Sequence, residues 1–390
     1  MYNRLQITNF LHLLFVTAAL IVVMNSTTLA QSKLFRVYIG TYTSGDSQGI
    51  YLSELDTETG ILAPPQLVAE TENPSFLALT PSASYLYAVN ETTDFKGEAA
   101  GSVSAYAVDS KSGKLTFLNQ QSTKGGAPCH LVIDNAAKNV LVANYVGGNV
   151  ACLPIHSDGS LQSTSSVIQH HGSSVNAGRQ EGPHAHSINL DPQNRFAFAA
   201  DLGLDKILVY RFDADLGTLT AHEPMGISVM PGAGPRHFAI HPNGQFAYVI
   251  NEMQLTVDAF TYDSKAGVLA SIQTISTVPE NTTGDNLSTA EIQVHPSGKF
   301  LYGSNRGHNT IVAYRIDPHN GTLSYIENQS TAGQTPRNFA IDPTGNYLLA
   351  ENQTTNTIVV LRIDPETGKL KPTGNSVKVP SPVCVKMIPR

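Results

Sequence analysis

Cysteine and basic charge are scarce in this sequence, and both shortages exclude classes of protein. The 390 residues contain three cysteines, Cys129, Cys152 and Cys384, whose wide spacing fits neither a disulfide framework nor a close-spaced zinc motif. We interpret Cys129 as a small buried apolar residue, with a catalytic thiol as the alternative. The chain carries 24 Lys and Arg against 31 Asp and Glu, a net charge of −7, so it offers no basic surface to nucleic acid.

An apolar run at the N-terminus has the pattern of an export signal. Arg4 precedes a mostly apolar stretch over residues 10–24, and Thr28-Leu29-Ala30 places small residues at the recognition positions of a cleavage site before Gln31. A membrane anchor is the alternative, but the run is shorter than the roughly 20 apolar residues of a spanning helix. We therefore expect residues 1–30 to be a cleaved signal peptide. The mature protein would then have no membrane span and would be exported, to the periplasm or outside the cell.

The rest of the chain has the composition of a turn-rich all-β protein. Charged residues make up only 14% of the sequence, hydrophobic residues 41%, and there are 31 glycines and 22 prolines. Short apolar or alternating segments are separated by Gly, Pro, Asn and Asp, and no convincing amphipathic helix follows the N-terminal run.

A turn of the form Asp-x-x-x-Gly-x-Leu recurs along the chain. Its glycine can supply the positive φ that a tight hairpin needs, and its Asp can accept hydrogen bonds from nearby backbone N–H groups. Six copies start at Asp56, Asp109, Asp213, Asp263, Asp317 and Asp364, and a copy one residue shorter starts at His156.

Two further landmarks repeat with a period of about 50 residues, which is typical of propeller blades. Apolar strands, several of them led by proline, start at residues 74, 128, 185, 235, 289, 336 and 382. In the first six copies an Asn or Asp lies 16 residues after the start, at Asn90, Asn144, Asp201, Asn251, Asn305 and Asn352. The last copy has no room for this partner, but residues 37–39 resemble the missing second strand.

These repeats predict a seven-bladed β-propeller of four-stranded antiparallel blades, formed as a single domain by residues 31–390. One blade should take its innermost strand from residues 382–388 and its outer three strands from residue 37 to about residue 62. Pairing of the N- and C-terminal strands would then close the ring.

The repeat also predicts which side chains meet at one mouth of the central channel. The innermost strand starts where the antiparallel second strand ends, so residues one past each landmark should form two rings on one face. Glu252 and Arg236 share a blade, His186 comes from the preceding blade and Arg306 from the following one. Arg236 and Glu252 could instead be a structural ion pair, His186 a packing residue and Arg306 a rim cation. Together, however, such residues in a concave site are suited to binding an anion and moving a proton.

The sequence around these residues resembles the lactonase family of seven-bladed propellers, which includes bacterial 6-phosphogluconolactonases and the fungal carboxy-cis,cis-muconate cyclase. The matching stretches are residues 38–42, 182–187, 234–238, 251–252 and 301–308. The resemblance implies that His186, Arg236, Glu252 and Arg306 form the active site. Family members that act on phosphogluconolactone are cytoplasmic, whereas this chain has the pattern of an exported protein, so the lactone is left open.

We therefore expect a lactone hydrolase that uses no metal or other cofactor and acts on a sugar-type or other anionic lactone. Glu252 or His186 would activate water, and Arg236 and Arg306 would bind the anionic group and stabilise the oxyanion. His237 and Arg337 are further substrate-binding candidates. The alternatives are an isomerase of the muconate-cyclase type and a non-catalytic propeller that binds a ligand or protein at the cell surface. We expect a monomer.

Overall fold

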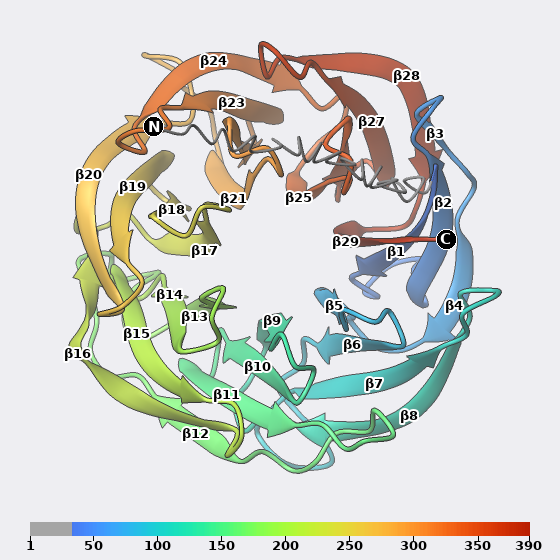
Figure 1. Ribbon diagram of the computed structural model, residues 1–390, viewed down its shortest axis with the longest axis vertical. Coiled ribbons are helices and arrows are strands. Elements are labelled where there is room, and N and C mark those ends of the chain that lie inside the picture. The colour runs from blue at the N-terminus through green and yellow to red at the C-terminus, as the bar shows by residue number, and fades with distance from the viewer. Residues whose placement is uncertain (1–32) are drawn as a thin grey trace, which may run out of the picture. The chain divides into compact units, whose positions relative to one another are not determined.

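Short strands joined by tight turns make up most of residues 33–390, the part of the chain that the computed structural model describes. Seven antiparallel sheets stand around a central axis (Figure 1). In six of them the innermost strand comes first in the chain, and in the seventh the innermost strand is the C-terminal strand β29. The seven-bladed β-propeller predicted from the repeats is thus confirmed. Residues 33–390 contain no α-helix, so none of them forms a helix long and apolar enough to cross a membrane. The expected signal peptide lies outside the described residues.

The blades are numbered along the chain, starting from the one that joins both ends. Blade 1 consists of β29 (Pro382–Pro389), β1 (Leu34–Thr41), β2 (Gly49–Asp56), β3 (Ile61–Leu62) and β4 (Gln66–Glu70). Blade 2 consists of β5 (Leu77–Leu79), β6 (Tyr85–Asn90), β7 (Ser102–Val108) and β8 (Leu115–Ser122). Blade 3 consists of β9 (Pro128–Ile133), β10 (Asn139–Asn144), β11 (Asn149–Pro154) and β12 (Ser166–Gln169). Blade 4 consists of β13 (Ala185–Leu190), β14 (Phe196–Asp201), β15 (Lys206–Asp213) and β16 (Thr218–Ser228). Blade 5 consists of β17 (Pro235–Ile240), β18 (Phe246–Asn251), β19 (Thr256–Asp263) and β20 (Val268–Ser276). Blade 6 consists of β21 (Ser288–Val294), β22 (Phe300–Arg306), β23 (Thr310–Ile316) and β24 (Leu323–Ser330). Blade 7 consists of β25 (Pro336–Ile341), β26 (Tyr347–Asn352), β27 (Thr357–Ile363) and β28 (Leu370–Lys378).

The ring closes as the sequence predicts, because β1 pairs with β29. Val37 lies opposite Met387, and Ile39 opposite Val385. The outer part of blade 1 reaches further than the expected residue 62, because its fourth strand is split into β3 and β4, which both pair with β2. Pro64 and Pro65 lie between the two pieces, and they interrupt the ladder because proline has no backbone N–H to donate.

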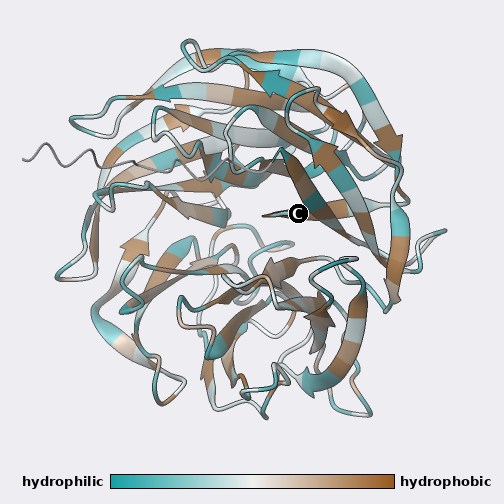
Figure 2. Cartoon of the chain, turned by 45° about the vertical axis from the view of Figure 1, so that its right-hand side comes forward, coloured by the Kyte–Doolittle hydropathy of each residue, from teal (hydrophilic) through white to brown (hydrophobic). Residues whose placement is uncertain are grey.

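The repeated turn joins the third and fourth strands of a blade and also contacts the preceding blade. In blade 6, Gly321 has φ +74°, and its N–H donates to the Asp317 carbonyl at 2.9 Å. The buried Tyr248 hydroxyl of blade 5 donates to the Gly321 carbonyl at 3.0 Å. Apolar side chains of neighbouring blades pack around such contacts, so most of the core lies between the sheets; Figure 2 shows the apolar residues along the strands.

A β-bulge near the start of most innermost strands shapes the channel. In blades 3, 4, 5 and 7 the pairing with the second strand skips the residue after the strand start, which is Cys129, His186, Arg236 or Arg337. A bulged residue has no single partner across the ladder, so its side chain can be directed away from the regular alternation. As a result, consecutive residues such as Arg236 and His237 both line the channel.

Candidate active site

One mouth of the channel holds a pocket of about 320 Å³ where most of the predicted residues meet. It is lined by Glu91, Cys129, Tyr145, Arg179, His186, Glu252, Arg306 and Arg337. This upper pocket lies where the innermost strands start and the second strands end, as the two landmark columns predict. Arg236 lies beneath it and is only 2% exposed.

Glu252 is the centre of an arginine cluster in the upper pocket. It follows β18, and its backbone N–H donates to the Gly234 carbonyl at 2.7 Å. The Glu252 Oε2 atom lies 3.0 Å from Arg236 Nε and 2.9 Å from an Arg306 guanidinium nitrogen. Its Oε1 atom accepts a hydrogen bond from Arg179 at 2.7 Å. Both carboxylate oxygens of Glu252 are therefore occupied by guanidinium groups.

The arginines keep Glu252 ionised and make it a weak base. Burial by itself would raise the pKa of Glu252, but Arg306, Arg236 and Arg179 bring it down from 4.5 to about 2. Burial lowers the pKa of Arg306 from 12.5 to about 10, which leaves its guanidinium charged at neutral pH. A carboxylate with so low a pKa has little tendency to take a proton from water.

His186, in the bulge of β13, also has a lowered pKa, but for a different reason and without a change in its charge at neutral pH. Burial, followed by the charges of Arg236, His237 and Arg337, holds the pKa of His186 well below its usual 6.5. Its imidazole is therefore neutral at neutral pH and able to accept a proton. His186 Nδ1 lies 3.6 Å from Cys129 Sγ. Burial raises the pKa of the Cys129 thiol, which agrees with the reading of Cys129 as an inert buried residue.

Arg337 is held on another side of the pocket by Tyr42 and Glu91. Its guanidinium donates to the Tyr42 hydroxyl at 3.0 Å and lies 5.4 Å from the centre of the Tyr42 ring. The Tyr42 hydroxyl in turn donates to Glu91 Oε2 at 2.8 Å, and Ser75 donates to the same oxygen at 2.5 Å. Arg337 therefore presents a fixed positive charge to the pocket.

The structure places His237 beneath the upper pocket, with its ring next to that of His186. His237 lies one layer deeper in the channel, and its Nδ1 is 3.1 Å from Glu291 Oε2. The ring contacts the narrow space beneath the upper pocket, together with Arg236 and His186. Its position supports a role below the pocket more than direct contact with a substrate.

The sequence reasoning missed Arg179. This residue lies in the connection between β12 and β13, residues 170–184. The connection has no counterpart in the repeat, so the repeat could not predict where its side chains lie. The neighbouring Gln180 is fully buried and donates to the Leu202 carbonyl at 2.8 Å, which fixes the loop over the pocket. Arg179 also donates to the Tyr145 hydroxyl at 3.3 Å. Glu91 and Tyr145 each lie one residue past the Asn landmark, at Asn90 and Asn144, and this position was the available signal for them.

No group of three or more His, Cys, Asp and Glu side chains in residues 33–390 is arranged to hold a metal ion. What the pocket offers instead is a neutral imidazole surrounded by fixed guanidinium groups. Such a combination can bind an anion, take a proton and stabilise a developing negative charge. The fold and this site together define an enzyme-like propeller with an arginine-lined pocket at one mouth of its channel.

Comparison with known proteins places this propeller more closely. Residues 36–387 match the model of the family described as "Lactonase, 7-bladed beta-propeller". The chain belongs to this lactonase family. A relative from Bacillus subtilis (strain 168), named 6-phosphogluconolactonase, is 41% identical over 90% of this chain and 97% of its own length. Another 6-phosphogluconolactonase, from Formosa agariphila, is 35% identical over 78% of this chain and 86% of its own length.

Solved structures agree with this assignment. A putative 6-phosphogluconolactonase from Bacteroides fragilis superposes with a TM-score of 0.85 at 37% identity, over 91% of this chain and 98% of its own. A periplasmic gluconolactonase from Pseudomonas aeruginosa superposes with a TM-score of 0.86 at 34% identity, over 91% of this chain and 99% of its own.

Proposed function

We propose that this member of the lactonase family, a lactone hydrolase, acts on an anionic sugar-type lactone with His186 as the base. One observation carries the assignment of roles: Glu252 has both oxygens bound by arginines, whereas the neutral His186 lines the same pocket. Glu252 is then a positioning residue that fixes Arg236, Arg306 and Arg179. Of the two roles that the sequence left open for Glu252 and His186, the geometry favours the histidine as base.

The reaction follows from this arrangement. A water molecule attacks the lactone carbonyl carbon while His186 takes one of its protons. The oxyanion that forms is stabilised by the charges of Arg306 and Arg337, which face the pocket. The bond between the carbonyl carbon and the ring oxygen then breaks, and His186 returns the proton to that oxygen. The product is the open hydroxy acid.

The substrate class follows from the charge of the pocket. Arg179, Arg306 and Arg337 line it and Arg236 lies beneath it, so these arginines outnumber the two glutamates there, Glu91 and Glu252. Positive charge remains for a carboxylate or phosphate on the substrate. The names of the relatives include both a phosphorylated and an unphosphorylated gluconolactone as substrate, and the arginines favour the phosphorylated type or another anionic lactone.

Steady-state hydrolysis of 6-phosphogluconolactone and gluconolactone by the purified protein, with and without EDTA, tests the function. We expect a higher kcat/KM for the anionic lactone and no effect of EDTA. His186→Gln should lower kcat by roughly 10² to 10⁴ with little change in KM, because glutamine cannot take the proton. His319→Gln, in an exposed turn, is the control. Full activity of His186→Gln together with loss of activity in Glu252→Gln would instead identify Glu252 as the base.

We also infer that the protein is exported and monomeric. The apolar run with its cleavage pattern before Gln31 supports export, and one relative is described as periplasmic. Mass measurement of the exported protein should give a chain that starts at or near Gln31, and retention of Met1 on membrane-bound protein contradicts export. Light scattering of the purified protein measures its oligomeric state.

A further inference from the structure

A second cavity opens at the other end of the channel, on the far side of a plug of three aromatic rings. The plug consists of Phe76, His130 and His237, whose ring centres lie 4.3, 5.9 and 5.2 Å apart in the three pairings. Below the plug lies a cavity of about 690 Å³, larger than the upper pocket of about 320 Å³. We call it the lower cavity.

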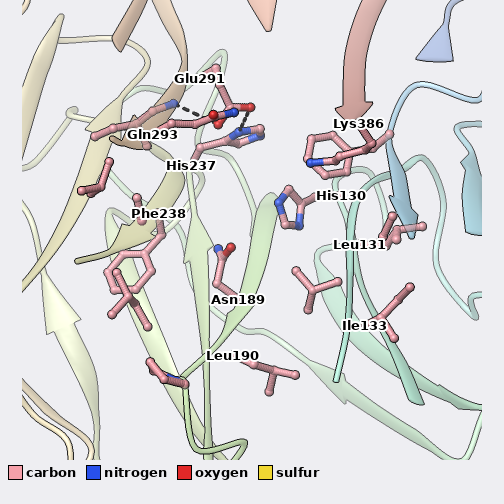
Figure 3. Close-up of a pocket in the computed structure, with 18 of the residues that line it drawn as sticks. His130, Leu131, Ile133, Asn189, Leu190, His237, Phe238, Glu291, Gln293 and Lys386 are labelled. Atoms are coloured by element: carbon pink, nitrogen blue, oxygen red, sulfur yellow. Dashed lines mark hydrogen bonds and ion pairs between the residues drawn. The ribbon is translucent and has the colours of Figure 1, made fainter. Parts of the chain in front are cut away.

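Three of the innermost strands carry a small side chain at one level of the lower cavity, and three others carry Asn189, Gln293 and Lys386 there. The fifth residue of the repeat unit is Ala78, Val132 or Ala239 in three of the blades that line the cavity. Larger apolar residues complete its wall, and Figure 3 shows Leu131, Ile133, Leu190 and Phe238 around it. The wall thus combines apolar and polar surface in about equal parts, and its apolar part suits the body of a small organic molecule.

Two hydrogen-bond donors at the plug end of the cavity lack an acceptor. Lys386 lies with its Nζ atom 4.5 Å from the centre of the Phe76 ring and forms no ion pair within residues 33–390. His130 Nδ1 accepts the backbone N–H of Ile188 at 3.3 Å, so its other nitrogen, Nε2, carries the proton. No acceptor for this Nε2–H lies in the described part of the chain. Figure 3 shows His130 and Lys386 next to each other at this end of the cavity.

No acidic group in residues 33–390 forms an ion pair with Lys386, although Glu291 is near enough for its charge to interact with that of Lys386. Glu291 lies beyond ion-pair distance from it and accepts hydrogen bonds from His237, Asn338 and its own neighbour Ile292. Glu351 is fully buried, and burial raises its pKa well above 4.5, which disfavours its charged form. Lys386 is the one Lys or Arg among the residues that line the lower cavity, and its charge is available to a ligand.

We propose that the lower cavity is a second ligand site, for a small organic carboxylate. The carboxylate group accepts hydrogen bonds from Lys386 Nζ and His130 Nε2, and the apolar body of the ligand lies against Ala78, Val132 and Ala239. A charge-assisted hydrogen bond from lysine is the main polar interaction of this site. The proposal is independent of the proposed lactone hydrolysis, because the ring plug separates the lower cavity from the upper pocket.

Titration calorimetry with sodium butanoate as the probe, and with butanamide as its uncharged counterpart, tests this site. Butanoate should bind the wild type in the millimolar range, and butanamide should not bind. Lys386→Met should weaken butanoate binding by roughly tenfold or more, because the charged donor is lost. Lys371→Met, on the exposed side of β28, is the matched control and should bind like the wild type.

Two further variants locate the bound anion and guard against misfolding of Lys386→Met. Ala239→Leu keeps Lys386 but fills the cavity, so it should also weaken butanoate binding. Arg306→Ala, in the upper pocket, should leave butanoate binding unchanged. Equal affinity of the wild type and Lys386→Met would overturn the proposal. So would the absence of butanoate binding to the folded wild type, or binding that is lost in Arg306→Ala and kept in Ala239→Leu.

Discussion

At the scale of single residues, the central channel shows how the surroundings of two similar side chains change their pKa in opposite directions. Glu252 and Glu291 are both buried glutamates near the channel axis, at 6% exposure each. Three arginines lower the pKa of Glu252 to about 2, whereas burial raises the pKa of Glu291. The first is a permanent counter-ion, and the second is held by neutral hydrogen-bond partners.

The ion cluster around Glu252 should make folding stability depend on acid pH. The folded-state pKa of Glu252 lies at about 2 and its ordinary value is 4.5, so its contribution is complete above pH 4.5 and is lost as the pH falls toward 2. The linked free energy is about 3 kcal/mol. Glu252→Gln should therefore show a weaker loss of unfolding free energy between neutral and acid pH in urea titrations. Glu54→Gln, from an exposed ion pair with Arg390, should follow the wild type.

Arg179 should contribute to recognition of the anionic substrate. Its side chain is 44% exposed and it is the most accessible partner of Glu252, so a substrate anion can share it without unfolding the cluster. Arg179→Ala should raise KM for an anionic lactone by roughly tenfold and leave KM for a neutral lactone unchanged. Arg362→Ala, at an exposed position of β27, is the control. Equal effects on both lactones would assign Arg179 to positioning of Glu252 alone.

At the scale of elements, the turn between the third and fourth strands connects the blades. The hydroxyls of Tyr38, Tyr87, Tyr248 and Tyr302 each donate to the carbonyl of a turn glycine in the next blade. The same turns were visible in the sequence as the Asp-x-x-x-Gly-x-Leu motif, but their contact with a neighbouring blade was not. Local turn chemistry and packing between blades therefore depend on the same few residues.

Removal of one such contact should show how much it contributes to the free energy of unfolding. Tyr248→Phe removes the hydroxyl that donates to Gly321 and leaves that buried carbonyl without the bond, which should lower the free energy of unfolding by about 1 kcal/mol. Lactone hydrolysis should be unaffected. Tyr325→Phe, at a tyrosine that is 52% exposed, should change stability much less. An equal loss of unfolding free energy in both variants would contradict a stabilising contribution of the contact between blades.

At the scale of the whole molecule, the ring depends on the C-terminal strand. β29 is the innermost strand of blade 1 and pairs with β1 along its length. Deletion of residues 380–390 should leave the edge of β1 unpaired and open the ring, so the melting temperature should fall sharply. Addition of a synthetic peptide of residues 380–390 should restore part of the lost melting temperature. An unchanged melting temperature of the truncated protein would contradict closure by this strand.

The sequence by itself determined the architecture, the ring closure and most of the upper pocket. Turn glycines, strand alternation and a repeat of about 50 residues are local signals, and a repeat fold places equivalent positions at equivalent points in space. The residue after each strand start therefore fell on the channel, and His186, Arg236 and Arg337 were found without coordinates.

Only the tertiary structure decided the electrostatic surroundings of these residues. The pKa values of Glu252 and His186 depend on burial and on distances to charges in other blades, which no spacing in the sequence records. Arg179 reaches Glu252 from a loop outside the repeat, and the ring plug forms because side chains from three different blades fill one cross-section of the channel. A repeat predicts where side chains point, but the free energy of a charge or a cavity is set by everything that surrounds it.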